Sequence, residues 1–194
     1  SKLLGGKTKT LYCLAPTDTI RENAPYIYGQ NGNPWATSNA YANVSGIEKA
    51  AGTMTPERRD GGGICCRMDV DLLEVCVLEF IDIQVLVPGT LFTGRNLEPI
   101  TTAKDPYQNI DFGVPFTGRP SALMFDYKCI VSPEEWVWYA KGFGKPKKQD
   151  GHDEVEAYLY LQHRWEDEKG DIHSIRVGTA YERFSKTQSE WVNG

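Results

Sequence analysis

Two stretches near the end of the chain carry aromatic and hydrogen-bonding side chains at alternate positions. The residues concerned are Glu156, Tyr158, Tyr160, Gln162 and Arg164 in the first stretch and Arg176 in the second. Sugar rings have apolar C–H faces that pack on aromatic rings, and their hydroxyl groups hydrogen-bond to amide, carboxylate and guanidinium groups. A strand face that presents both kinds of side chain suits carbohydrate binding. We therefore expect the two tyrosines, the glutamine and the two arginines to contact sugar.

Other residues could contribute to the same surface. Trp136 and Trp138 belong to the run Glu134–Tyr139, which we place in a loop, and Asp126 lies in an earlier alternating stretch. Tyr and Trp are also common where a protein packs against a partner, so these rings could instead face a partner domain or lie beneath loops. The residues alone favour neither interpretation.

A pair of glutamates offers a second kind of chemistry, glycoside hydrolysis, which needs two carboxylates about 5 to 9.5 Å apart. We expect two antiparallel strands in which His163 lies opposite Ile175. That register places Glu156 opposite Glu182, with Cβ atoms about 5 Å apart. Like charges directly opposite each other are unfavourable, so two exposed edge glutamates are the alternative interpretation.

The elements that position these residues are strands, because apolar and polar residues alternate with a period of two. The pattern predicts strands over Ser121–Val131, Val155–Trp165 and Ile172–Phe184, with a polar turn over Glu166–Asp171. Such strands bury one face of an antiparallel sheet and leave the other in water. We therefore expect an all-β chain whose default architecture is two packed sheets.

The expected register of the last two strands puts apolar residues on apolar residues, with Leu161 opposite Val177. On the polar face Gln162 then lies opposite Arg176. Tyr160 lies opposite Gly178, where the missing side chain leaves space above the ring.

The first half of the chain is less regular. A short strand is expected near Thr8–Ala15, and a glycine-rich turn over Asp60–Gly63 precedes a strand over Ile64–Val70. Leu72–Val87 fits a buried strand pair or one long bent strand. An amphipathic helix over Leu72–Ile83 is the rival prediction, because the hydrophobic period is ambiguous.

Composition bounds the class of protein. The chain has 194 residues, of which 40% are hydrophobic and 24% charged, so it is long enough to bury a core as one domain over residues 1–194. The formal net charge is −5 and no basic stripe dominates, which argues against nucleic acid as a partner. No apolar run reaches about 18 residues, so we expect no transmembrane segment.

Cysteines and histidines give little support for a metal or a cofactor. No C-x-x-C spacing occurs among the five cysteines, so we expect buried free thiols, with one disulfide as the alternative. We expect a packed His163 and an exposed His173 rather than metal ligands. Asp69–Asp71 and Asp150–Glu154 could supply oxygen ligands to a structural calcium ion. No other cofactor is expected.

Three segments together resemble a known family. They are Asn33–Asn39, Pro88–Gly94 and Phe112–Leu123, and they carry Trp-x-Thr-x-Asn, Gly-x-Leu-Phe-Thr-Gly and Gly-x-Pro-Phe followed by Arg-Pro. In this combination they resemble the putative carbohydrate metabolism domain of Bacteroidetes-type secreted proteins. The likeness runs from about residue 33 to residue 184. Asp126 and Cys129 depart from the family's Tyr-Tyr-Lys-Tyr strand.

The resemblance implies a jelly-roll β-sandwich of two antiparallel sheets, a secreted, periplasmic or cell-surface location, and a role connected with carbohydrate. It implies no catalytic residues. The chain stops before a late acidic strand of the family pattern, so C-terminal strands of that pattern are expected to be missing. Arg119, between two prolines that direct the chain into its strand, is expected to satisfy backbone carbonyls or a buried carboxylate.

Residues and resemblance together predict a non-catalytic carbohydrate-recognising module that binds an oligo- or polysaccharide. Two alternatives stay open: a glycoside hydrolase that uses Glu156 and Glu182, and a structural or assembly domain whose aromatic residues pack against another chain of a surface complex.

Overall fold

The computed structural model describes residues 12, 14, 34–44, 47–77, 81–98, 100, 106–139 and 145–194. Most of the predicted strand near Thr8–Ala15 lies outside these residues. The described chain is all-β apart from one 3₁₀ turn over Pro106–Asn109, which confirms the predicted class. It divides into two compact units, Ser1–Phe116 with Ala140–Pro146, and Thr117–Tyr139 with Lys147–Gly194.

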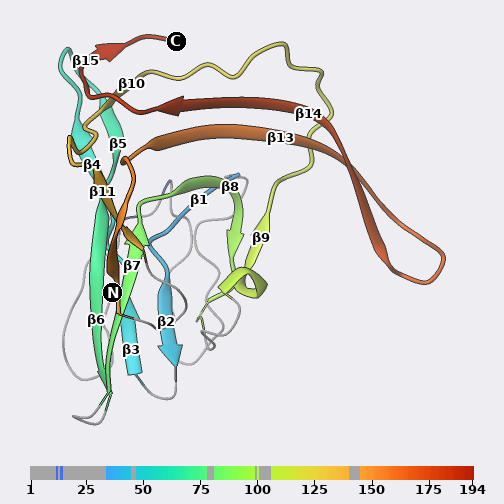
Figure 1. The fold of residues 1–194 in the computed structure, drawn as a ribbon. Helices are drawn as coiled ribbons and strands as arrows, with labels where there is room; N and C mark the ends of the chain where they lie inside the picture. Colours follow the sequence, from blue (N-terminus) through green and yellow to red (C-terminus); the bar gives the residue numbers. More distant parts are fainter. Residues whose placement is uncertain are drawn as a thin grey trace. The chain divides into compact units, whose positions relative to one another are not determined.

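Each unit is built from antiparallel strands (Figure 1). The first unit contains β1 (Trp35–Thr37), β2 (Tyr41–Val44), β3 (Ile47–Ala50), β4 (Met54–Arg58), β5 (Ile64–Met68), β6 (Val70–Val77), β7 (Ile81–Pro88), β8 (Leu91–Asn96) and β9 (Ile110–Phe112). The second contains β10 (Tyr127–Cys129), β11 (Trp136–Tyr139), β12 (Lys147–Asp150), β13 (Val155–Glu166), β14 (Ile172–Phe184) and β15 (Gln188–Val192).

Among the described residues these strands form one three-stranded and six two-stranded sheets. The two-sheet sandwich expected from the sequence is therefore not confirmed, because each sheet is small and none closes on itself. Alternation of apolar and polar residues reports that a strand has two unlike faces, but it does not report how many neighbours the strand has. No helix within the described residues has the length and hydrophobicity needed to span a membrane.

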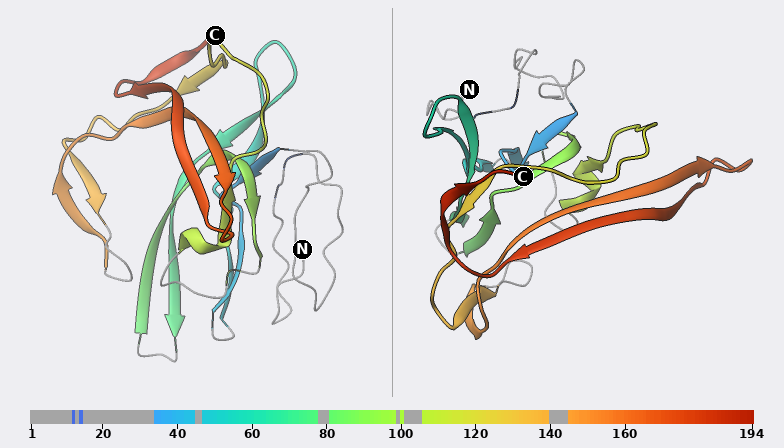
Figure 2. Two further views of the ribbon diagram at one scale, coloured as in Figure 1. Left: turned by 90° about the vertical axis from the view of Figure 1, so that its right-hand side faces the viewer. Right: turned by 90° about the horizontal axis from the view of Figure 1, so that it is seen from above.

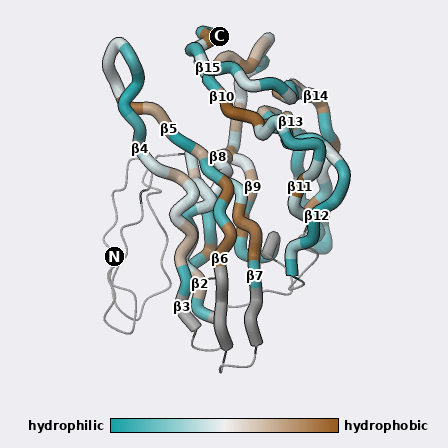
Figure 3. Tube along the Cα trace, turned by 60° about the vertical axis from the view of Figure 1, so that its left-hand side comes forward, coloured by the Kyte–Doolittle hydropathy of each residue, from teal (hydrophilic) through white to brown (hydrophobic). Residues whose placement is uncertain are grey.

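The prediction of a strand pair over Leu72–Val87 is confirmed, although Leu72 is 40% exposed rather than buried, and the rival helix is wrong. β6 and β7 pair antiparallel from Val70 opposite Pro88 to Val77 opposite Ile81. Hydrophobic residues gather on these two strands (Figure 3). Aliphatic and β-branched residues favour such a pleated surface over a helix.

The turn over Asp60–Gly63 is also confirmed, because it joins β4 to β5. Gly61, Gly62 and Gly63 have φ angles of 89°, 107° and 92°, which L-residues with a side chain rarely adopt.

A buried hydrogen-bond cluster holds the three-stranded sheet β1–β8–β9 to the strand β4. The Asn39 side chain donates from Nδ2 to Met54 O (2.7 Å) and accepts from Met54 N at Oδ1 (2.9 Å). Ser38 and Thr53 share a hydrogen bond between their hydroxyl oxygens, 2.9 Å apart. Asn39 and Thr53 are almost fully buried, so these bonds satisfy groups that water cannot reach.

The same sheet requires a glycine. Gly94 pairs with Phe112 and has a φ of 135°, and a Cβ there would lie only 2.2 Å from Asp111 O. β8 pairs on its other side with β1, where Trp35 lies opposite Thr93 and Thr37 opposite Leu91. All three segments that carry the family resemblance thus contribute residues to this sheet.

The second unit contains a small cluster of half-buried aromatic residues. Tyr127 and Phe184 have ring centroids 4.4 Å apart, and Phe125 lies 6.3 Å from Phe184. The predicted strand over Ser121–Val131 is mostly wrong, because only Tyr127–Cys129 pairs, with β15. The residues before Tyr127 have no ladder partner there, so alternation alone does not make them a strand.

Glu98 is the described carboxyl group most removed from water. It is 3% exposed, and neither carboxylate oxygen makes a hydrogen bond of good geometry within the described residues, although the backbone of Tyr41 lies near enough to offset a small part of the effect of burial on its pKa. Burial raises its pKa from 4.5 to about 8, because a charged carboxylate is costly away from water.

Glu98 should make stability depend on pH. Its folded-state pKa is raised, so between pH 4.5 and about 8 the folded protein binds more protons than the unfolded chain. The free energy of unfolding therefore falls as pH rises through this window, by about 1.4 kcal/mol per unit of pKa difference. Urea titrations at several pH values measure this free energy of unfolding.

Glu98→Gln should flatten this dependence, since the amide does not titrate, whereas the exposed Glu135→Gln should leave it unchanged. If the free energy of unfolding falls equally steeply with pH in Glu98→Gln and in the parent protein, Glu98 is not the cause of the pH dependence.

Candidate functional site

The predicted sugar-binding residues lie mainly on a long two-stranded hairpin, β13–β14. The predicted bounds are confirmed within one residue at each end, and Figure 2 shows the two strands side by side along their length. Tyr158 and Tyr160 are exposed, whereas Leu159 and Leu161, on the other face, are half-buried. The polar aromatic face is thus open to water, as the alternation predicted.

The register agrees with the prediction only in the half of the hairpin near its turn. His163 lies opposite Ile175 and Gln162 opposite Arg176, as expected. The pairing then shifts by one residue between Leu161 and Gln162, and Val177 has no partner. This is a β-bulge, which inserts one extra residue into one strand.

Beyond the bulge every predicted pair is displaced by one residue. Leu161, not Tyr160, lies opposite Gly178, and Tyr160 lies opposite Thr179. A Cβ at Gly178 would lie 3.2 Å from Leu161 Cδ1, so the leucine side chain fills the space that the glycine leaves.

The predicted carboxylate pair is therefore wrong. Glu156 lies opposite Arg183 and Glu182 opposite Ala157, so the two glutamates lie on opposite faces of the ribbon. The pair on which the hydrolase alternative rested does not form.

Glu156 instead belongs to an ion-pair cluster at the stem of the hairpin. Tyr181 Oη donates to Glu156 Oε1 (2.6 Å), and Arg183 Nη2 donates to the same oxygen (2.7 Å). Arg183 Nη1 also pairs with Glu154 Oε2 at 3.0 Å. The hydrogen bonds from Tyr181 and Arg183 lower the pKa of Glu156, and the bond to Glu156 raises the pKa of Tyr181. The carboxylate is thus held in its charged form.

Four planar groups form a row along the open face, here called the tyrosine–arginine row: Tyr181, Tyr158, Tyr160 and Arg176. The Tyr158 ring centroid lies 6.5 Å from that of Tyr181, with planes 28° apart, and 5.0 Å from that of Tyr160, with planes 33° apart. The Arg176 guanidinium carbon lies 3.7 Å from the Tyr160 ring centroid, in a cation–π contact.

Gln162 and Arg164 continue the same face towards the turn, opposite Arg176 and Ser174. Asp126 does not join them: it precedes β10, and its Oδ1 accepts a hydrogen bond from Gly194 N at 3.2 Å. The structure therefore brings Tyr158, Tyr160, Gln162, Arg164 and Arg176 onto one face and places Asp126 elsewhere.

Trp136 and Trp138 lie on a strand, β11, and not in a loop as predicted. β11 pairs with β12, so Lys148 is opposite Trp138. Its ammonium group lies 3.6 Å from the Trp136 ring centroid and 5.9 Å from that of Trp138. Trp136 Nε1 donates to Glu134 Oε2 (2.9 Å). Lys148 thus covers part of the Trp136 ring, whereas Trp138 stays 48% exposed.

The opposite face of the hairpin carries a second ring stack. His163, Trp165 and His173 stack with centroids 5.3 and 5.4 Å apart, and His173 Nε2 lies 2.8 Å from Asp167 Oδ2. His163 is exposed, so the prediction that it packs inside is wrong. Among the described strands, β13 and β14 pair only with each other.

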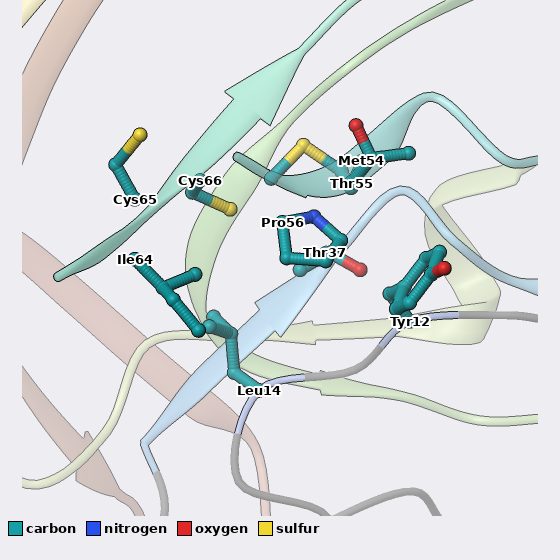
Figure 4. Close-up of a pocket in the computed structure, with 9 residues that line it drawn as sticks. All are labelled: Tyr12, Leu14, Thr37, Met54, Thr55, Pro56, Ile64, Cys65 and Cys66. Atoms are coloured by element: carbon teal, nitrogen blue, oxygen red, sulfur yellow. The ribbon is translucent and has the colours of Figure 1, made fainter. Parts of the chain in front are cut away.

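The first unit contains an open hollow of about 230 Å³, shown in Figure 4. Its lining is mainly apolar and includes Leu14, Met54, Pro56, Ile64, Cys65 and Cys66. Burial and the neighbouring Cys65 raise the pKa of Cys66, which favours the unreactive thiol. Cys65, Cys66 and Cys129 are free, as predicted, but half-buried rather than buried.

The remaining predicted residues do not assemble into a site. Arg119 is exposed and makes no hydrogen bond or ion pair to the described parts of the chain, so its structural role stays a prediction. Asp69 is engaged by Arg67, whose Nε donates to Oδ2 at 2.9 Å. No cluster of three potential metal ligands occurs among the described residues. Structural calcium stays a prediction.

Sequence reasoning missed two residues of the open face, Tyr181 and Arg183. Strict alternation from Arg176 puts both of them on the other face, and only the bulge returns them. The available signal was Val177-Gly178, since a glycine inside a strand often marks a bulge.

No family model matches the chain, and neither a curated protein nor a solved structure shows a significant match to it.

The register can be tested by cross-linking. Directly opposite residues have Cα atoms about 4.5–5.5 Å apart, which a disulfide can span. We expect the double variant Ala157→Cys with Glu182→Cys to form a disulfide under mild oxidation, found by mass spectrometry of non-reduced peptides. Glu156→Cys with Glu182→Cys should not form one. The reverse result would restore the register without a bulge.

Proposed function

We propose that this chain is a non-catalytic carbohydrate-recognising module, and that the sugar lies on the open face of β13–β14. The observation that carries the proposal is the row of exposed tyrosines beside hydrogen-bonding side chains. Tyr158 is 55% exposed and Tyr181 46% exposed, although both are large aromatic residues. Such rings offer apolar area at a low cost in side-chain entropy.

The contacts within the row give its members different roles. Arg176 covers one face of Tyr160, so Tyr160 positions the guanidinium rather than offering that face to a sugar. Tyr158 and Tyr181 are left as the stacking residues. Gln162 and Arg164 extend beyond them with amide and guanidinium donors for hydroxyl groups.

The stem cluster makes this face suitable for recognition rather than for acid catalysis. Glu156 is ionised and engaged by two donors, so it is not available as a proton donor to a glycosidic oxygen. The same bonds hold the Tyr181 ring in place. A preformed ring reduces the entropy lost on binding.

The resemblance to the putative carbohydrate metabolism domain supports the same ligand class. With it we propose a secreted, periplasmic or cell-surface location and an oligo- or polysaccharide as the ligand. The jelly-roll sandwich that the resemblance implies belongs to this proposal too.

A glycan array followed by calorimetry tests the proposed function. Tyr158→Ala should weaken binding of any retained glycan by about tenfold, because one stacking contact and its buried area are lost. Tyr181→Phe should keep most of the affinity, since the ring stays.

Trp165→Ala is the matched control, because this exposed ring lies on the other face of the same hairpin. The proposal fails if no glycan binds, or if Tyr158→Ala and Trp165→Ala behave alike.

A second candidate function is assembly with another chain. Apolar side chains near the hairpin turn are exposed: Ile172 is 64%, Ile175 56% and Val177 66% exposed. Isolated two-stranded ribbons are marginal in water, so a partner that covers these residues would stabilise the ribbon.

Assembly predicts concentration-dependent self-association, or capture of another chain, that Ile175→Ser with Val177→Ser abolishes. Sedimentation velocity over a wide concentration range measures the self-association. A monomer at every concentration, with no effect of the double variant, contradicts self-assembly.

A further inference from the structure

The arginines of the open face are not equivalent. Arg183 is neutralised, because its guanidinium pairs with Glu154 at 3.0 Å and Glu156 at 2.7 Å. Arg176 contacts only the Tyr160 ring, and Arg164 has no hydrogen bond or ion pair within the described residues. Two positive charges on this face thus have no carboxylate partner among the residues that the structure describes.

The register places these two charges close together. Gln162 lies opposite Arg176 and Arg164 opposite Ser174, so the two arginines are diagonal neighbours on one face. Like charges on neighbouring positions repel, and Gln162 between them offers no neutralising charge. Of the acidic residues along the face, Glu156 is bound by Arg183, and Glu166 forms no ion pair with Arg164 within the described residues.

The contact with Tyr160 prepares Arg176 to bind an anion. A guanidinium that lies over a ring uses its flat face for that contact, while its N–H donors lie in its own plane and stay free. Those donors match the two oxygens of a carboxylate or a sulfate. Because the ring already limits the movement of the side chain, less entropy is lost when an anion binds.

We propose that the open face binds an anionic glycan, with Arg164 and Arg176 holding a carboxylate or sulfate group of the sugar while Tyr158 packs on a ring. This inference rests on the proposed carbohydrate-binding function and narrows it to a substrate class. The overall charge of −5 would repel such a polymer elsewhere, which makes the local positive charge the determinant of where it binds.

The experiment compares three polysaccharides of similar length by calorimetry: sodium polygalacturonate, dextran sulfate and neutral dextran. At least one charged polymer should bind more tightly than dextran, and its affinity should fall as salt rises from about 0.05 to 0.5 M. Binding of polygalacturonate identifies the anionic group as a carboxylate, and binding of dextran sulfate identifies it as a sulfate.

Three variants assign the effect to the named residues. Arg164→Gln and Arg176→Gln should each weaken binding of the charged polymer by about tenfold and reduce its salt dependence. Arg176→Lys should weaken binding as much as Arg176→Gln does, because an ammonium lacks the planar pair of donors. Arg95→Gln, which removes an exposed arginine paired with Asp111, is the matched control and should change nothing.

Each outcome separates this inference from the function on which it rests. If neutral glycans bind through Tyr158 and neither glutamine variant matters, the anionic class is wrong and the carbohydrate function stands. If no glycan of either kind binds, both fail. If oligothymidylate binds more tightly than either charged polysaccharide, the arginines and tyrosines serve a nucleic acid and the inference is overturned.

Discussion

One unpaired residue, Val177, determines which side chains meet on the β13–β14 hairpin. Without the bulge, Glu156 would face Glu182 and Tyr158 would face Ala180. With it, Glu156 faces Arg183 and Tyr158 faces Tyr181, so a repulsive pair becomes an ion pair and an aromatic pair forms. Cross-strand pairs of this kind contribute about 0.2–1 kcal/mol each. Several of these pairs together favour the shifted register. That register determines which side chains lie on the open face.

Sequence patterns were most informative where a strand has two unlike faces. The bounds of β14 agree with the prediction at both ends, because its alternation is long and a polar turn precedes it. The strand pair over Leu72–Val87 was likewise recognisable from its aliphatic residues. The register of β13 and β14 was recovered only up to the bulge, since each half of the hairpin is compatible with apolar pairing on its own.

Sheet partners were less predictable than strands. The pattern over Ser121–Val131 alternates as clearly as that of β13, yet only the strand Tyr127–Cys129 forms within it, where Tyr127 and Cys129 have partners on β15. Alternation records the chemistry of the two faces, whereas a strand also needs backbone partners, which no local pattern identifies. The same limit applies to Trp136 and Trp138. Their strand partner, β12, lies further along the chain, and no pattern around the tryptophans identifies it.

Thr37, Asn39 and Gly94, which belong to the motifs singled out in the sequence, serve the scaffold of the first unit. Thr37 and Asn39 are buried and hydrogen-bonded, and Gly94 allows β8 to approach β9. A buried amide that pairs with the backbone of Met54 tolerates few replacements, because any other side chain would leave polar groups unsatisfied. Motifs of this kind identify a fold more readily than a ligand, so the ligand has to be argued from the hairpin.

The contacts that shape the candidate site also hold the hairpin together. Each joins one strand to the other: Tyr158 to Tyr181, Tyr160 to Arg176, and Glu156 to Arg183. A two-stranded ribbon has little core of its own, so these side-chain contacts carry a large share of its stability. A ligand that binds across both strands would favour the same arrangement and stabilise it further, because binding to the folded form alone shifts the equilibrium towards it. The same cross-strand contacts therefore shape the candidate site and stabilise the hairpin.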